Sequence, residues 1–158
     1  MSITEAYKTT LKEIADLKDY VGKELGISQW TTITQEQINT FAEVTADHQW
    51  IHVDIERCKK ESPFGKPIAH GFLVLSLASN FAYEAYSVEN ARMGVNYGLD
   101  KVRFTNPTPV DSRLRGRVSL LEYEEREGGA RYKMSIVFEL EGSERPACVA
   151  EFIALAFP

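Results

Sequence analysis

Residues 72–86, FLVLSLASNFAYEAY, limit the possible folds more than any other stretch of the chain. Apolar side chains occupy nearly every position of this segment, and its only charged residue is Glu84. A helix that is apolar on all sides belongs in the interior of a protein rather than on its surface. The segment therefore predicts a long central helix that is buried in the core.

Segments with the pattern of β-strands follow this helix: residues 93–105, 112–125, 130–141 and 146–157. In the second of these, Leu114 and Val118 alternate with polar residues, which is typical of a strand with one buried face. Gly128-Gly129 and residues 141–143 supply turn chemistry, so neighbouring strands are expected to form antiparallel hairpins. These patterns predict an α+β fold in which an antiparallel sheet wraps around the central helix.

The amino-terminal segment predicts an amphipathic helix over residues 4–18. Four residues of this segment follow helical spacing: Tyr7, Leu11, Ile14 and Lys18. Thr4 is a candidate N-cap for this helix. We therefore expect residues 1–24 to form a helical extension of a single domain that spans residues 1–158.

Thr34 and Gln37 form a T-x-x-Q capping box. The box follows residues 27–34, whose β-branched and aromatic content is typical of a short strand. A helix is therefore expected to begin at Gln35 and to carry the chain to Ala46.

The segment TADHQWIH, residues 45–52, comes directly after this predicted helix and places one carboxylate and two imidazoles close together. Since an imidazole has a pKa of about 6.5, it can exchange protons near neutral pH. Asp47 and His52 are therefore candidates for an acid–base pair, although a loop aspartate also commonly bonds nearby backbone amides. His48 and His52 have the i, i+4 spacing of zinc ligands on a helix. Because the predicted helix ends before them and no third ligand is evident, we expect no metal site.

The composition narrows the classes of function. A net charge of −5 and a pI near 5.3 disfavour binding to nucleic acid, which requires clustered Lys and Arg. The first 20 residues alternate charged and apolar positions, so they predict neither a signal peptide nor a membrane span. We expect a cytoplasmic protein with no membrane partner. Cys58 and Cys148 lie far apart in the sequence and are expected to be reduced structural thiols.

Three segments together resemble the MaoC-like dehydratases, the family of R-specific enoyl-CoA hydratases with a hot-dog fold. They are FAEVTADHQWIHVD (41–54), PFGKPIAHGFLVLSLAS (63–79) and VNYGLDKVRFTNPTPVDSRLRG (95–116). The resemblance covers about residues 25–157 and extends to the nodulation protein N branch of the family. It implies a homodimeric hot-dog domain that adds water reversibly to a trans-2-enoyl thioester, giving the R-3-hydroxyacyl product. A thioester of CoA or of phosphopantetheine is then the substrate, and no cofactor is implied.

The same resemblance implies that Asp47 and His52 hold the water that adds across the double bond. In the family motif, four residues separate the Asp from the His around an Asn-Pro core. Here Gln49-Trp50 replaces Asn-Pro, so the loop lacks the fixed φ of a proline.

Gly71, at the start of the central helix, is implied by the resemblance to donate its N–H to the thioester carbonyl oxygen. A helix N-terminus offers free N–H groups, and the absence of a Cβ lets a carbonyl approach the backbone. An ordinary turn glycine is the structural alternative. Ser79, two turns into the helix, has a supporting role in which it bonds to Asp47, or else it returns its hydroxyl to the i−4 carbonyl. His70 is expected to be a structural or supporting histidine rather than a proton carrier.

Two other functions remain open at this stage. A hot-dog acyl thioesterase would direct water to the carbonyl carbon, but such enzymes usually carry a carboxylate on the central helix or opposite it, and residues 72–83 contain no acid. A non-catalytic acyl-thioester binding module would share the pocket, yet it could tolerate the loss of Asp47 or His52. Retention of both residues favours the hydratase.

Overall fold

The computed structural model of the chain describes residues 5–158. Its strands are β1 (Tyr7–Leu11), β2 (Glu24–Ile27), β3 (Thr31–Thr32), β4 (Tyr86–Val88), β5 (Met93–Arg103), β6 (Arg113–Arg126), β7 (Gly129–Leu140) and β8 (Cys148–Phe157). Its helices are η1 (Ile14–Tyr20, a 3-10 helix), α1 (Gln35–Thr45), α2 (Trp50–Val53), α3 (Ile55–Glu61), α4 (Gly71–Ser76) and α5 (Ala78–Ala85). Across the described residues, none of these helices is long and apolar enough to cross a membrane.

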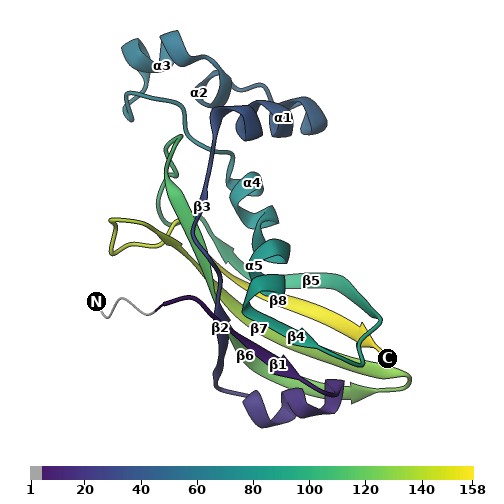
Figure 1. Cartoon of the computed structure of the whole chain (residues 1–158). Coiled ribbons are helices and arrows are strands. Elements are labelled where there is room, and N and C mark those ends of the chain that lie inside the picture. The colour runs from purple at the N-terminus through teal and green to yellow at the C-terminus, as the bar shows by residue number, and fades with distance from the viewer. Residues whose placement is uncertain (1–4) are drawn as a thin grey trace.

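The strands form one sheet in the order β4-β1-β2-β6-β7-β8-β5, and β3 pairs with β6 beside this path. The predicted hairpins are confirmed, because β6–β7 and β7–β8 pair antiparallel across their turns. The sheet is nevertheless mixed, since β1 and β4 pair in parallel. The sheet curves around α5, while α1, α2 and α3 lie together beyond one end of it, joined to α5 through α4 (Figure 1). The α+β class is therefore correct, and the purely antiparallel sheet is not.

The prediction of an amino-terminal helix is wrong. Residues Tyr7–Leu11 form strand β1, which pairs with β2 on one side and β4 on the other, and the helical turns that follow it belong to the short η1. The core buries Leu11 of β1 together with Ile14 and Leu17 of η1. The apparent helical spacing of the buried residues therefore comes from a strand and a short 3-10 helix. Hydrogen bonds to two neighbouring strands override the local pattern. The predicted cap at Thr4 lies outside the described residues.

Helix α1 begins where the capping box predicts. The Gln37 N–H donates to the Thr34 hydroxyl over 3.2 Å, and the Thr34 N–H donates to the Gln37 side chain over 2.9 Å. The helix ends at Thr45 because Ala46 adopts a left-handed conformation with a φ of 59°. The segment expected to be one short strand is divided between the end of β2 and the two-residue strand β3.

The central helix differs from its prediction in two ways. It is divided at Leu77 into α4 and α5, rather than continuous. One side packs into the core, where Phe81 and Ala85 are fully buried, but Phe72 and Tyr83 on other sides remain 69% and 75% exposed. The apolar surface that the sequence places all round this helix is therefore only partly covered by its own chain.

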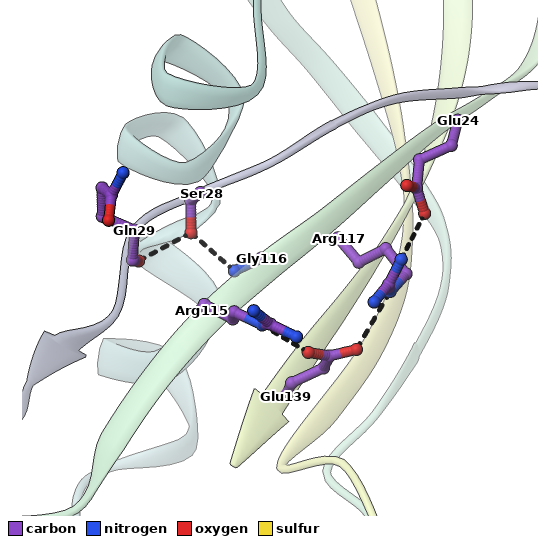
Figure 2. A network of polar contacts seen from close by, with 7 residues as sticks. All are labelled: Glu24, Ser28, Gln29, Arg115, Gly116, Arg117 and Glu139. Carbon is purple, nitrogen blue, oxygen red and sulfur yellow. Dashed lines mark hydrogen bonds and ion pairs between the residues drawn. The ribbon is translucent and has the colours of Figure 1, made fainter. Parts of the chain in front are cut away.

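A polar network ties β2, β6 and β7 together on the sheet (Figure 2). The Glu139 carboxylate accepts hydrogen bonds from Arg115 Nε over 2.6 Å and from Arg117 Nε over 3.0 Å, and Arg117 Nη1 donates to Glu24 over 2.7 Å. The Gly116 N–H donates to the Ser28 hydroxyl over 2.8 Å. Burial alone would raise the pKa of Glu139, but the hydrogen bonds from the two arginines outweigh it and hold that pKa below its ordinary value.

Glu139→Gln is expected to lower the free energy of unfolding at pH 7 by about 1–3 kcal/mol, because the nearly buried Arg115 loses its carboxylate partner. The lowered pKa means that Glu139 contributes fully above its unfolded-state value near 4.5 and loses that contribution as the pH falls through its folded value. Urea denaturation at pH 7 and at pH 4 measures both effects. Glu141→Gln is the matched control: its pair with Arg113 is half exposed and contributes about 1 kcal/mol or less. Equal losses in the two variants would contradict this assignment.

Candidate active site

The loop after α1 presents Asp47 at the surface. The left-handed Ala46 turns the chain out of the helix, and the Asp47 Oδ1 accepts the Gln49 N–H over 3.3 Å. This local bond is the structural role that the sequence left open for Asp47. The Gln49 N–H uses one lone pair of one carboxylate oxygen. The remaining lone pairs of Asp47 can accept hydrogen bonds from a substrate water.

His52 lies on the short helix α2 and is buried, with 6% of its surface exposed. Its Nδ1 lies 2.7 Å from the Ile68 carbonyl oxygen. A carbonyl only accepts hydrogen bonds, so we assign the proton to Nδ1, which leaves Nε2 with a free lone pair. Gln35 holds the backbone of this turn, because its Nε2 donates to the His52 carbonyl oxygen over 2.8 Å.

Burial is the main influence on the His52 imidazole and lowers its pKa, since the charged form loses its hydration. The Ile68 carbonyl and the Asp47 carboxylate oppose this effect, while His70 adds to it. The outcome is a pKa below the ordinary value of 6.5. His52 is therefore mainly neutral at physiological pH and suited to accept a proton.

His70, the residue before α4, completes a cluster with the predicted pair. Its ring stacks on that of His52 with a centroid separation of 3.9 Å and an interplanar angle of 23°, and its Nε2 lies 3.0 Å from the Asp47 carbonyl oxygen. One ligand-type atom from each of Asp47, His52 and His70 lies within 4.8 Å of the others. One water can bridge such a gap through two hydrogen bonds of about 2.8 Å.

The residues that could hold a metal ion differ from the His48 and His52 pair considered in the sequence. His48 is exposed and lies 3.8 Å from Glu43, away from the imidazole cluster. The cluster residues with potential ligand atoms are instead Asp47, His52 and His70. The two cluster rings are nearly parallel, so their in-plane lone pairs do not converge well on one ion. The expectation of no metal site stays a prediction.

Gly71 is the first residue of α4 and lines the same cleft as His52. This cleft has a volume of about 250 Å³, and its other walls include Phe104, Asn106 and Thr108. The first N–H groups of a helix have no acceptor within the helix. A Cβ on Gly71 would lie 3.2 Å from the Phe104 ring, which is tighter than ordinary van der Waals contact, so a larger residue here would press on this wall of the cleft.

Ser79 lies apart from these residues. It is exposed on α5 and lines a second cleft, together with Asn96 and Tyr97 from β5. Within residues 5–158, its hydroxyl makes neither the bond to Asp47 nor the back-bond to the i−4 carbonyl that the sequence suggested. The structure therefore brings Asp47 close to His52, places Gly71 in the cleft that His52 lines, and places Ser79 in a different cleft.

Sequence reasoning missed three residues of this site or gave them too small a role. His70 was expected to be a structural or supporting histidine, without a specific partner, and its place beside Gly71 in a chain with three histidines was the available signal. Gln35 was noted only as the start of a helix, yet it holds the backbone of His52. Thr108 is buried and lines the cleft from a loop near β6, and no local pattern marks it.

Comparison with known families decides what kind of protein carries this site. Residues 16–137 match the family described as MaoC like domain. This match covers well over half of the chain. The chain belongs to the MaoC-like family. The resemblance stated from the sequence motifs is thereby confirmed.

Known relatives of the MaoC-like chain include two kinds of protein. It is 48% identical over 145 residues to 3-hydroxyacyl-thioester dehydratase Z of Mycobacterium tuberculosis (strain ATCC 25618 / H37Rv), which covers 91% of this chain and 95% of that protein. It is 44% identical over 146 residues to nodulation protein N of Rhizobium leguminosarum bv. viciae, with coverage of 90% and 89%. Each alignment covers about nine tenths of this chain and about nine tenths or more of the relative.

Solved structures agree with the fold of the MaoC-like chain. The R-hydratase PhaJ1 from Pseudomonas aeruginosa superposes with a TM-score of 0.70 at 21% identity, covering 86% of this chain and 81% of that one. A monoamine oxidase regulatory protein from Archaeoglobus fulgius superposes with a TM-score of 0.76 at 25% identity, covering 94% and 95%. The hot-dog fold expected from the motifs is therefore confirmed, with the mixed sheet and the divided helix described above.

Proposed function

We propose that this chain is a 3-hydroxyacyl-thioester dehydratase that also runs in reverse, adding water to a trans-2-enoyl thioester to give the R-3-hydroxyacyl product. One observation carries the proposal: His52, with its free Nε2, and Gly71 at the N-terminus of α4 line one cleft, and a carboxylate oxygen of Asp47 lies within 4.8 Å of a His52 ring nitrogen. A relative with this printed activity is 48% identical over nearly the whole chain, which supports the same reaction here.

In the hydration direction, the Asp47 carboxylate and the His52 imidazole hold a water molecule between them. His52 Nε2 takes one proton as the water oxygen forms a bond to C3 of the substrate. The electrons of the C2–C3 double bond then move toward the thioester carbonyl, whose oxygen becomes negative. The pair returns a proton to C2, which restores both side chains and leaves a hydroxyl on C3. Because water is added without a net oxidation or reduction, the reaction needs no redox cofactor.

The Gly71 N–H is the donor that we assign to the negative carbonyl oxygen. It begins α4, so the positive end of the helix dipole points toward the cleft. A donor placed where charge develops contributes more to the rate than one that binds only the ground state. Both CoA and a phosphopantetheine arm present the same thioester to this site.

We also propose that the chain forms a homodimer through β5. This strand lies at the edge of the sheet, with unpaired backbone groups on one side. Its exposed apolar residues are Met93, Val95, Tyr97 and Leu99. Tyr97 and Leu99 line the same cleft as the exposed Phe72 of α4. A second copy that paired with β5 would also cover the cleft lined by Ser79.

Light scattering after size-exclusion chromatography tests the dimer. The expected mass is twice that of the 17.9 kDa chain. Leu99→Arg should shift the protein toward monomer, because it places a charge on the proposed interface. Lys101→Ala, on the same strand but already polar, is the matched control. A monomeric mass for the unmodified protein would contradict the proposal.

The reaction itself is tested by mixing the purified protein with short- and medium-chain trans-2-enoyl-CoA. Absorbance of the conjugated enoyl group and release of free thiol are followed in the same cuvette. The proposal expects loss of absorbance without thiol release. Thiol release would assign the protein to the thioesterases. No change in either the enoyl absorbance or the free thiol would favour a non-catalytic binding role.

A further inference from the structure

His70 makes two contacts that the proposed reaction does not use. Its Nε2 lies 3.0 Å from the backbone carbonyl oxygen of Asp47, and its ring stacks on the His52 ring. One side chain therefore contacts both members of the proposed acid–base pair. The His70 backbone also leads directly into Gly71, the proposed oxyanion donor.

The hydrogen bonds of the two histidines fix opposite tautomers. The Asp47 carbonyl can only accept, so His70 carries its proton on Nε2. The Ile68 carbonyl places the proton of His52 on Nδ1 by the same reasoning. The other nitrogen of His70, Nδ1, is buried and has no hydrogen-bond partner among residues 5–158. It is not placed to carry a proton to or from the substrate.

The surroundings of His70 hold its ring in place. It is 2% exposed, and Phe41 of α1 packs against it with a centroid separation of 5.0 Å, while His52 stacks on it. The loop that carries Asp47 has no proline to restrict its φ angles, because Gln49-Trp50 occupies the motif. The bond from His70 therefore adds to the local restraints on this loop, which include the 3.3 Å bond from the Gln49 N–H to Asp47 Oδ1 and the 3.0 Å bond from the His52 N–H to the Gln49 carbonyl oxygen.

We propose that His70 is a positioning residue for this reaction: its Nε2–H holds the Asp47 loop, and its ring sets the orientation of the His52 imidazole. The inference rests on the proposed function, because it assigns His70 to the pair that performs it. A misplacement of about 1 Å in a catalytic group can lower a rate about 100-fold, so such a residue matters without touching the substrate.

The first test observes the tautomers directly. The chain contains only His48, His52 and His70, so long-range ¹H–¹⁵N correlation of histidine-labelled protein resolves each ring. The inference expects His52 in the Nδ1–H form and His70 in the Nε2–H form at neutral pH. A His70 ring protonated on Nδ1 would overturn it. Because this spectrum requires no turnover, it tests the bond even if the wild-type protein hydrates no thioester, so the two failures give different results.

The second test separates the donor from the ring. His70→Phe keeps a ring but loses the N–H, and it is expected to lower kcat about 10- to 100-fold while KM changes less than about threefold. His70→Gln keeps a donor for the Asp47 carbonyl and should lose less of kcat. The exposed His48→Gln is the control and should behave as wild type.

The pH profile distinguishes positioning from general destabilisation. The titratable groups that influence His52 are His70 and Asp47, and burial lowers its pKa. Both variants remove the pKa-lowering influence of His70 on His52, and His70→Gln also exposes His52 more, so the acid limb of kcat/KM should move to higher pH in both variants and furthest in His70→Gln. Wild-type kcat in His70→Phe, or equal losses in both variants with no change in either pH profile, would overturn the proposal. Thermal unfolding of each variant establishes that it is folded under the assay conditions.

Discussion

His52→Ala is expected to lower kcat for hydration of an enoyl thioester by about 10²- to 10⁴-fold, which is the usual contribution of a positioned base. The Ile68 carbonyl dictates that the His52 Nε2 is the basic nitrogen, and alanine leaves no group to take the proton from water. Asp47→Asn should have a similar effect, because an amide keeps the shape of the side chain but cannot hold water as a carboxylate does. Steady-state kinetics with enoyl-CoA measures both losses.

His48→Ala is the matched control for these variants, since His48 lies in the same eight-residue segment but is exposed, with its Nε2 3.8 Å from the Glu43 carboxylate. Its kcat should equal that of the wild type. The wild-type profile of kcat/KM should fall only below pH 6.5, because a lowered His52 pKa keeps the base neutral down to that region. Full activity in both His52→Ala and Asp47→Asn would show that the reacting groups lie elsewhere.

Gly26→Ala is expected to destabilise the fold by about 3 kcal/mol or more, which is the upper range for overpacking. A Cβ at this position in β2 would overlap the Ala85 backbone carbonyl oxygen at the end of α5 and would lie 2.6 Å from the Tyr7 carbonyl oxygen. Backbone atoms cannot move aside as a flexible side chain can. Strand β2 would therefore have to move away from α5 and from β1. Chemical denaturation measures the loss.

Gly94→Ala is the control for this substitution, because a Cβ on Gly94 in β5 meets no atom within 4 Å in this chain. Its change in stability should be below about 1 kcal/mol. If Gly26→Ala were as stable as Gly94→Ala, the close approach of α5 to β2 would not exist in solution.

Local patterns predicted the parts of the fold that local forces determine. The alternation along β6 and β7 and the turn at Gly128-Gly129 were sufficient to place a hairpin. The reciprocal hydrogen bonds of Thr34 and Gln37 placed the start of α1. In both cases the interacting residues lie close together in the sequence or in strands joined by one short turn. The local sequence pattern was therefore enough to predict the interaction.

The errors arose where distant segments decide the structure. Strands β1 and β4 are short, five and three residues, and they pair in parallel although most of the chain's helices lie between them in sequence. Neither strand has a distinctive pattern, and the apparent helix periodicity at Tyr7 and Leu11 was stronger. The exposed side of the central helix also depends on surfaces that one chain does not cover.

The candidate site shows the same division. Asp47 and His52 were recognised because they lie together in one short segment with chemistry suited to proton transfer. Their hydrogen bonds could not be foreseen, because Ile68 is 16 residues from His52 and His70 is 23 residues from Asp47. The separation of Ser79 from the pair also became visible only in the folded chain.

The central claim, that Asp47 and His52 add water to C3, is tested most directly by the fate of labelled oxygen. The wild-type protein is incubated with a trans-2-enoyl thioester in H₂¹⁸O, and the products are analysed by mass spectrometry with chiral separation. The account predicts one ¹⁸O in the C3 hydroxyl of an intact R-3-hydroxyacyl thioester, formed about 10²- to 10⁴-fold more slowly when Asp47→Asn replaces the wild type. Label in a free carboxylate, or label at C3 that persists undiminished in Asp47→Asn, would contradict it.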